Sequence, residues 1–125
     1  MELIDRQKRI LVLDKDNRIR SVVDEMLDYG DWDVSVTYDP YAVYDKAKIY
    51  KPDLIILDYL LLDNDCALIC QDFKDDTQLR DIPVIVVTAY KTRKANPDFF
   101  KCDALFIKPL DMSVLASRME YLMAS

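Results

Sequence analysis

The sequence predicts an α/β fold in which helices cover both faces of a doubly wound parallel sheet. Three short apolar runs, at residues 10–13, 54–57 and 84–87, show no polar alternation and are bounded by charged residues or proline. Runs of this kind are typical of central strands that are buried on both faces. Helical patterns separate them, so a strand and a helix alternate five times along the chain.

The remaining elements complete this alternation. Residues 104–107 form a shorter apolar run, and residues 34–38 alternate, which indicates a half-exposed edge strand. Helices are expected over residues 19–27 with Gly30 ending the first, from Asp39-Pro40 to about Tyr50, along the stripe Cys66, Ile69, Cys70 and Phe73, over a short stretch between 90 and 101, and from Asp111 through Leu122. Right-handed crossovers then favour the strand order 2-1-3-4-5.

Composition limits the classes of function. The chain has 125 residues, which fits a single domain over residues 1–125. Its net charge of -6 argues against direct binding to nucleic acid, whose phosphates require a basic surface. No apolar run approaches the roughly 20 residues that span a bilayer, and residues 1–9 hold no signal segment. We therefore expect a cytoplasmic protein with no membrane partner.

Polar residues follow four of the predicted strands. Asp14, Asp58, Thr88 and Lys108 each stand at the carboxyl end of an apolar run, and the chain has no histidine. A single Asp after a strand is more often a turn residue than a nucleophile. Two carboxylates, a hydroxyl and an ammonium at one sheet edge nevertheless suit phosphoryl transfer to a carboxylate, assisted by a divalent cation. The pattern predicts a phosphate or metal site at that edge.

Four segments together resemble the receiver domain of bacterial response regulators, the phospho-accepting module of two-component signalling. They are ILVLD at residues 10–14, PDLIILD at 52–58, IPVIVVTA at 82–89 and IKP at 107–109. The segments span nearly the whole chain in the order that this family shows. The resemblance implies a flavodoxin-like (βα)5 fold.

The resemblance also implies roles for individual residues. Asp58 would accept the phosphoryl group, and Thr88 and Lys108 would bind its oxygens. Mg²⁺ would be held by Asp14, Asp58 and the backbone carbonyl of Leu60. The Lys108-Pro109 peptide bond would be cis. The donor would be a phosphohistidine on a sensor histidine kinase or phosphotransfer protein, and the domain would not be an enzyme beyond accepting this group and losing it slowly.

Several positions depart from the family pattern. Lys15 stands where a second acidic metal ligand is usual, which predicts weak Mg²⁺ binding, and Asp16 is a further candidate ligand. Leu105 stands where a Tyr or Phe switch residue is usual. Neither Leu60 nor Tyr90 is an acid or a carboxamide that could orient water, so slow hydrolysis of the acyl-phosphate is expected.

Three alternatives stay open. The domain could be a degenerate pseudo-receiver that acts as an interaction module without phosphorylation, as Lys15 and Leu105 suggest. Less well supported is a phosphatase of the haloacid dehalogenase type, in which Asp14 is the nucleophile and Asp16 the acid–base. A homodimer through the fourth helix, fifth strand and fifth helix is also open.

Overall fold

The computed structural model describes residues 7–14, 26, 29–59, 64–89 and 101–124. Five strands form one sheet: β1 (Arg9–Asp14), β2 (Asp33–Thr37), β3 (Leu54–Tyr59), β4 (Val84–Thr88) and β5 (Ala104–Ile107). Their order is β2-β1-β3-β4-β5, and every neighbouring pair is parallel. Both the predicted strand order and the predicted fold class are confirmed.

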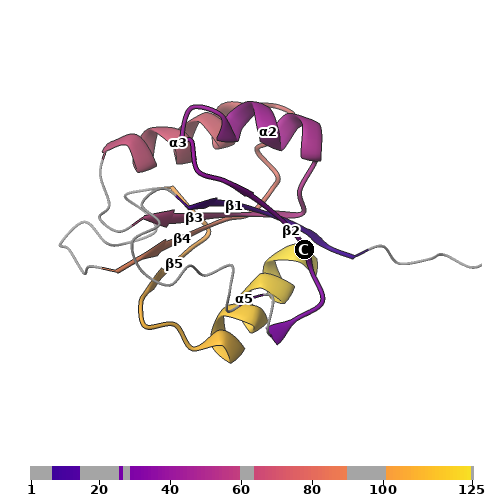
Figure 1. The fold of residues 1–125 in the computed structure, drawn as a ribbon. Helices are drawn as coiled ribbons and strands as arrows, with labels where there is room; N and C mark the ends of the chain where they lie inside the picture. The colour runs from indigo at the N-terminus through magenta and orange to yellow at the C-terminus, as the bar shows by residue number, and fades with distance from the viewer. Residues whose placement is uncertain (1–6, 15–25, 27–28, 60–63, 90–100, 125) are drawn as a thin grey trace, which may run out of the picture.

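Helices pack against the two faces of this sheet. The helices α2 (Val43–Tyr50) and α3 (Asn64–Asp75) cover one face, and α5 (Met112–Ala124) covers the other, as Figure 1 shows. Within the described ranges, no helix combines the length and the apolar character needed to cross a membrane.

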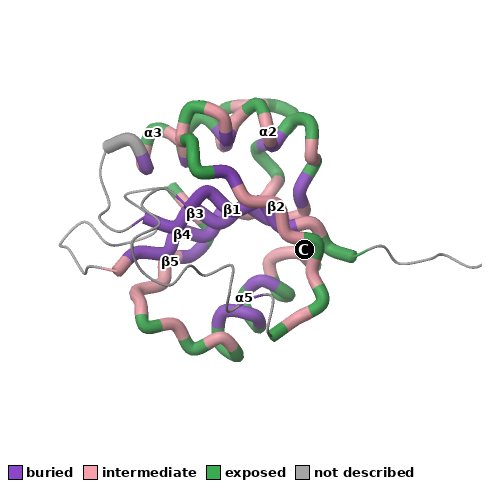
Figure 2. Tube along the Cα trace, viewed as in Figure 1, coloured by how far each residue is buried: buried purple, intermediate pink, exposed green. Residues whose placement is uncertain are grey.

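Burial on both faces explains why the central strands are continuously apolar. Along β1, Leu11 and Leu13 pack in the cluster beneath α2 and α3, whereas Ile10 and Val12 pack in the cluster beneath α5. The central strands β1, β3 and β4 therefore contribute alternate side chains to two cores. Figure 2 shows the central strands buried between the helical layers. Cys66 and Cys70 lie in the cluster beneath α2 and α3, so both thiols are part of the core.

The predicted start of the second helix is wrong. We expected Asp39 to cap a helix with Pro40 in its first turn, but α2 begins only at Val43. The Asp39 carboxylate instead accepts a hydrogen bond of 2.9 Å from the backbone N–H of Tyr41, and Ala42 N donates to Asp39 O at 3.0 Å. This local turn satisfies the backbone groups that a helix would otherwise have used.

Other predicted helix ends are confirmed. The Asp111 carboxylate accepts hydrogen bonds from the backbone N–H groups of Ser113 (3.0 Å) and Val114 (3.4 Å), as an N-cap does. The helix α2 ends at Tyr50, and Lys51 follows with φ of 55°. Most of the predicted first helix lies outside the described residues. The same holds for the helix expected between residues 90 and 101, of which only residue 101 is described.

The amino edge of the sheet uses the same device twice. Asp53 precedes β3 and accepts a hydrogen bond of 2.8 Å from Arg9 N, while its own N–H donates to Arg9 O at 2.8 Å. Asp103 precedes β5 and is paired in the same way with Val84, at 2.7 Å and 2.8 Å. Each aspartate thereby pairs the first residue of the neighbouring strand, whose N–H would otherwise lie at the open end of the ladder.

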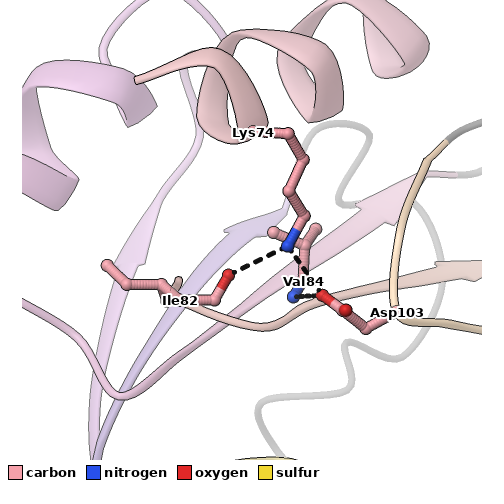
Figure 3. A network of polar contacts seen from close by, with 4 residues as sticks. All are labelled: Lys74, Ile82, Val84 and Asp103. Carbon is pink, nitrogen blue, oxygen red and sulfur yellow. Dashed lines mark hydrogen bonds and ion pairs between the residues drawn. The ribbon is translucent and has the colours of Figure 1, made fainter. Parts of the chain in front are cut away.

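A lysine joins the second of these pairs to the helical layer. Lys74, in the last turn of α3, lies 2.9 Å from Asp103 Oδ2 and donates to Ile82 O at 3.3 Å (Figure 3). The contact links the end of α3 to the starts of β4 and β5. It holds the amino edge of the sheet, away from the carboxyl ends of the strands.

Candidate functional site

The carboxyl ends of the strands bring the four predicted polar residues to one edge of the sheet. Asp14 is the last residue of β1 and is in register with Asp58 on β3. Thr88 is the last residue of β4 and is in register with Ile107 on β5, directly before Lys108. In this strand order the switch point lies between β1 and β3, where open α/β sheets bind their ligands.

Lys108 contacts Asp58 directly. The Lys108 Nζ atom lies 3.1 Å from Asp58 Oδ2, and the two side chains are only 12% and 5% exposed. The lysine is positioned by its backbone, because its N–H donates to Thr88 O at 2.8 Å. The Lys108-Pro109 bond is cis, as predicted. With so little water around the pair, the charges interact more strongly than an exposed pair would.

The two other predicted residues are buried beside this pair. Asp14 is 5% exposed and Thr88 is fully buried. A second carboxylate and a hydroxyl thus reach the edge at which Asp58 and Lys108 meet. The group offers two carboxylates, one ammonium and one hydroxyl within a poorly hydrated region.

The donor set fits Mg²⁺. This ion prefers oxygen ligands and is commonly held by one or two carboxylates together with waters and phosphate oxygens. Asp14 and Asp58 supply two carboxylates in register on adjacent strands. Across the ranges that the structure describes, no cluster of three or more Asp, Glu, His or Cys side chains forms a fuller cage.

Some predicted site residues lie outside the described residues: Lys15, Asp16, Leu60 and Tyr90. Leu105, at the position of the expected switch residue, is described and packs partly buried against the core beneath α2 and α3. Its neighbour Phe106 packs against the opposite core. The two side chains therefore point to different faces of the sheet.

The sequence analysis missed a polar cluster between α2 and α3. The Tyr44 hydroxyl donates to Asp76, and Lys48 Nζ lies 3.2 Å from the same carboxylate oxygen. Tyr44 and Lys48 are one helical turn apart, which places both on one face of α2. The four-residue spacing of Tyr44 and Lys48 is visible in the sequence. Nothing in the sequence showed that Asp76, just after α3, would lie opposite them.

Comparison with known proteins assigns the family. Residues 10–120 match the response regulator receiver domain family, and this match covers most of the chain. The chain therefore belongs to the receiver domains of response regulators. Domains of this family are signalling modules that bind Mg²⁺ in their active site and interact with histidine kinases or phosphotransfer proteins.

Curated relatives agree with this assignment. The chain is 31% identical over 117 residues to the DNA-binding dual master transcriptional regulator RpaA of Synechocystis sp., covering 92% of this chain and 48% of that protein. It is 25% identical over 108 residues to the polar-differentiation response regulator DivK of Brucella anthropi, covering 84% and 87%. The chain thus spans about half the length of RpaA and most of DivK.

Solved structures share the fold. A putative response regulator from Chloroflexus aurantiacus superposes with a TM-score of 0.82 at 19% identity, covering 96% of this chain and all of the other. The receiver domain of a sensor histidine kinase from Pseudomonas aeruginosa, solved with a magnesium ion in its active-site cleft, has a TM-score of 0.78 at 18% identity and the same coverage. At these identities the likeness shows the fold.

Proposed function

We propose that this domain accepts a phosphoryl group on Asp58 and relays it as a change in protein–protein contacts. The observation that carries the proposal is the 3.1 Å contact between Asp58 and Lys108 at the carboxyl edge of the sheet, beside buried Asp14 and Thr88. In this assignment Asp58 is the nucleophile, and Lys108 and Thr88 bind the oxygens of the transferred group.

The transfer exchanges one bond for another. An oxygen of the Asp58 carboxylate attacks the phosphorus of a phosphohistidine on a sensor histidine kinase or phosphotransfer protein. The P–N bond breaks, the imidazole nitrogen leaves with the electron pair and takes up a proton, and an acyl-phosphate remains on Asp58. Lys108 contacts the free Asp58 carboxylate, and after transfer its ammonium can move to the phosphoryl oxygens and stabilise their charge.

Mg²⁺ is the proposed cofactor. Asp14 and Asp58 would hold it, with Asp16 and the backbone carbonyl of Leu60 as further candidate ligands. When bound, the ion would offset the negative charge that the nucleophile and the phosphoryl group share. Lys15 replaces a usual acidic ligand in the sequence, which supports weak binding.

Intact-protein mass spectrometry after incubation with acetyl phosphate and Mg²⁺ tests the assignment. We expect one phosphoryl adduct on the parent and none on Asp58→Asn, which keeps the size of the side chain but removes the nucleophile. The Asp14→Asn variant should form the adduct more slowly, because it loses a metal ligand. The decay of the adduct after donor removal measures the predicted slow autodephosphorylation.

Other outcomes would redirect the assignment. Phosphatase turnover that depends on Asp14 rather than Asp58 would favour the haloacid dehalogenase reading. An adduct that forms on Lys15→Asp but not on the parent would mean that Lys15 has silenced the site. The domain would then be a pseudo-receiver whose contacts do not depend on phosphorylation.

A further inference from the structure

A groove on the outer surface between α2 and α3 lies away from the carboxyl-edge site. It encloses about 390 Å³ and is lined by Tyr41, Tyr44, Leu68, Ile69, Asp45 and Asp72, among others. This volume falls within the roughly 300–1,000 Å³ of clefts that bind ligands. We call it the α2–α3 groove. Figure 1 shows the two helices side by side on one face of the sheet.

The walls of the α2–α3 groove are held in place by contacts between the helices. Tyr44 stacks on Phe73 of α3 with ring centroids 5.9 Å apart, and its hydroxyl donates to Asp76. Lys48 reinforces the link through its 3.2 Å contact with Asp76 and lies 4.9 Å from the centre of the Tyr44 ring. Because both helices contribute to these contacts, the groove exists before any partner arrives, which lowers the entropic cost of binding.

Large apolar side chains are exposed at the α2–α3 groove. Tyr41, which precedes α2, is 89% exposed, and Leu68, in α3, is 59% exposed. Scattered exposed apolar residues are ordinary, but two that flank one concave site form a surface from which a partner can exclude water. Tyrosine is well suited to this role, because it offers a large contact area at low cost in conformational entropy.

The charge at the α2–α3 groove is negative. Asp45 and Asp72 line it, and an adjoining hollow is lined by Asp72, Asp75 and Asp76. In the part of the chain that the structure describes, Asp45, Asp72 and Asp75 form no ion pairs. The nearby cations are already engaged, since Lys48 pairs with Asp76 and Lys74 pairs with Asp103.

We propose that the α2–α3 groove docks an amphipathic helix of a partner protein, with a large apolar anchor flanked by lysine or arginine. The anchor would enter the space between Tyr41 and Leu68, and the flanking cations would pair with Asp72 and Asp75. Helices commonly bind in grooves through such spaced anchors. A second copy presenting the same face is disfavoured, because it would oppose acidic side chains to acidic side chains in a chain of net charge -6.

Binding of a designed peptide tests this proposal. The probe is a fluorescein-labelled helical peptide of about 14 residues, roughly four turns, with a Leu and Phe stripe flanked by Lys. A second peptide carries the same stripe flanked by Glu, and a third carries the lysines without the stripe. Anisotropy gives the affinity, and ¹⁵N chemical shifts locate the binding site. Neither phosphodonor nor Mg²⁺ is present, so the result is independent of whether Asp58 accepts a phosphoryl group.

Matched variants separate the α2–α3 groove from general charge attraction. Asp72→Lys and Leu68→Ser should each raise the Kd of the basic amphipathic peptide about tenfold. Glu120→Lys makes the same charge reversal, and Val114→Ser a similar apolar-to-polar change, at exposed positions of α5. Both should leave Kd within about twofold. The shifts should be confined to residues 40–50 and 68–77.

Any one of four results would overturn the proposal. Equal binding of the three peptides, or equal loss in Asp72→Lys and Glu120→Lys, would indicate unspecific attraction. Shifts centred on α5 or on the carboxyl edge would place the peptide elsewhere. A concentration-dependent dimer in sedimentation equilibrium that Leu68→Ser abolishes would mean that a second copy occupies the α2–α3 groove.

Discussion

Asp58 and Lys108 are 50 positions apart in the chain, and their side chains meet because of strand order and side-chain length. Asp58 belongs to β3 and Lys108 follows β5, with β4 between them. The lysine must therefore reach across the end of β4, and neighbouring strands are spaced by about 4.8 Å. The long lysine side chain can do this, whereas a short side chain at the same position could not. The strand order therefore requires a long side chain at position 108 for a cation to reach Asp58.

Replacement of Lys15 tests the role of the missing acidic ligand. Lys15→Asp should bind Mg²⁺ about tenfold more tightly, because it removes a cation beside Asp14 and adds a carboxylate. Isothermal titration calorimetry measures the change. Lys8→Asp makes the same charge change before β1, at the opposite edge of the sheet, and should leave Mg²⁺ affinity nearly unaltered. If Lys15→Asp binds no better than the parent, Lys15 does not weaken the site.

Asp76 should make stability depend on pH in the acid range. The hydrogen bond from Tyr44, the backbone N–H of Gln78 and the nearby Lys48 lower the pKa of Asp76 to about 2. In the unfolded chain its pKa is about 3.9. Because the folded pKa is the lower one, the contribution of Asp76 to stability is fully present above about pH 5 and is lost as pH falls towards 2.

Urea denaturation at several pH values measures this effect. The difference in midpoint between the parent and Asp76→Asn should be largest above pH 5 and should shrink steadily towards pH 2. Asp75→Asn is the matched control, because Asp75 is an exposed neighbour without a described ion pair, and its difference should be small at every pH. A constant difference for Asp76→Asn would contradict the role of ionisation.

At the scale of elements, Gly30 shows how a correct prediction can rest on a different cause. The sequence places a glycine where the first helix should end, and Gly30 N does bond to Met26 O at 3.0 Å. Yet Gly30 does not adopt the left-handed conformation that such glycines usually supply. A Cβ atom here would lie only 2.6 Å from the ring of Trp32. The glycine is therefore needed for space, so that the indole can pack over the backbone.

Gly30→Ala should destabilise the protein by about 1–3 kcal/mol, the usual cost of forcing a side chain out of a packed position. In Trp32→Leu the obstructing ring is absent, so the same glycine replacement should cost much less. Thermal unfolding followed by circular dichroism measures both, and a double-mutant cycle gives the coupling. Equal costs in the two backgrounds would mean that the Trp32 ring is not the obstacle. Trp32 is the only tryptophan, so its fluorescence also reports its displacement in Gly30→Ala.

The elements differ in how far the sequence could predict them. The central strands could be predicted because burial on both faces leaves continuous apolar runs. The candidate site could then be predicted from the polar residues at the carboxyl ends of those runs. The start of α2 could not be predicted, because Asp39 could either cap a helix or close a turn. Partners across the sheet, such as Asp103 with Val84, depend on which strands become neighbours. Local residue patterns carry no such information, so these contacts and the α2–α3 groove emerged only from the fold.

For the molecule as a whole, we expect the carboxyl-edge site to oppose stability until a cation binds. Asp14 and Asp58 are neighbours in register, and each is only 5% exposed. Two carboxylates in a poorly hydrated site repel each other, and the Lys108 ammonium offsets this repulsion at Asp58. If Asp58 accepts a phosphoryl group as proposed, function and stability conflict at this edge, as they often do where a site must bind a charged ligand.

Removing one carboxylate should consequently stabilise the metal-free protein. Asp14→Asn is expected to raise the unfolding free energy by about 1 kcal/mol and Tm by about 4 °C in EDTA. Mg²⁺ at ten times its Kd should stabilise the parent by about 1.4 kcal/mol through mass action, and Asp14→Asn by clearly less. Urea and thermal unfolding with and without Mg²⁺ measure both effects, and Asp81→Asn, at an exposed position, should respond to Mg²⁺ like the parent. If Asp14→Asn is instead the less stable protein in EDTA, the Asp14 carboxylate supports the fold, and repulsion at this edge is not what limits stability.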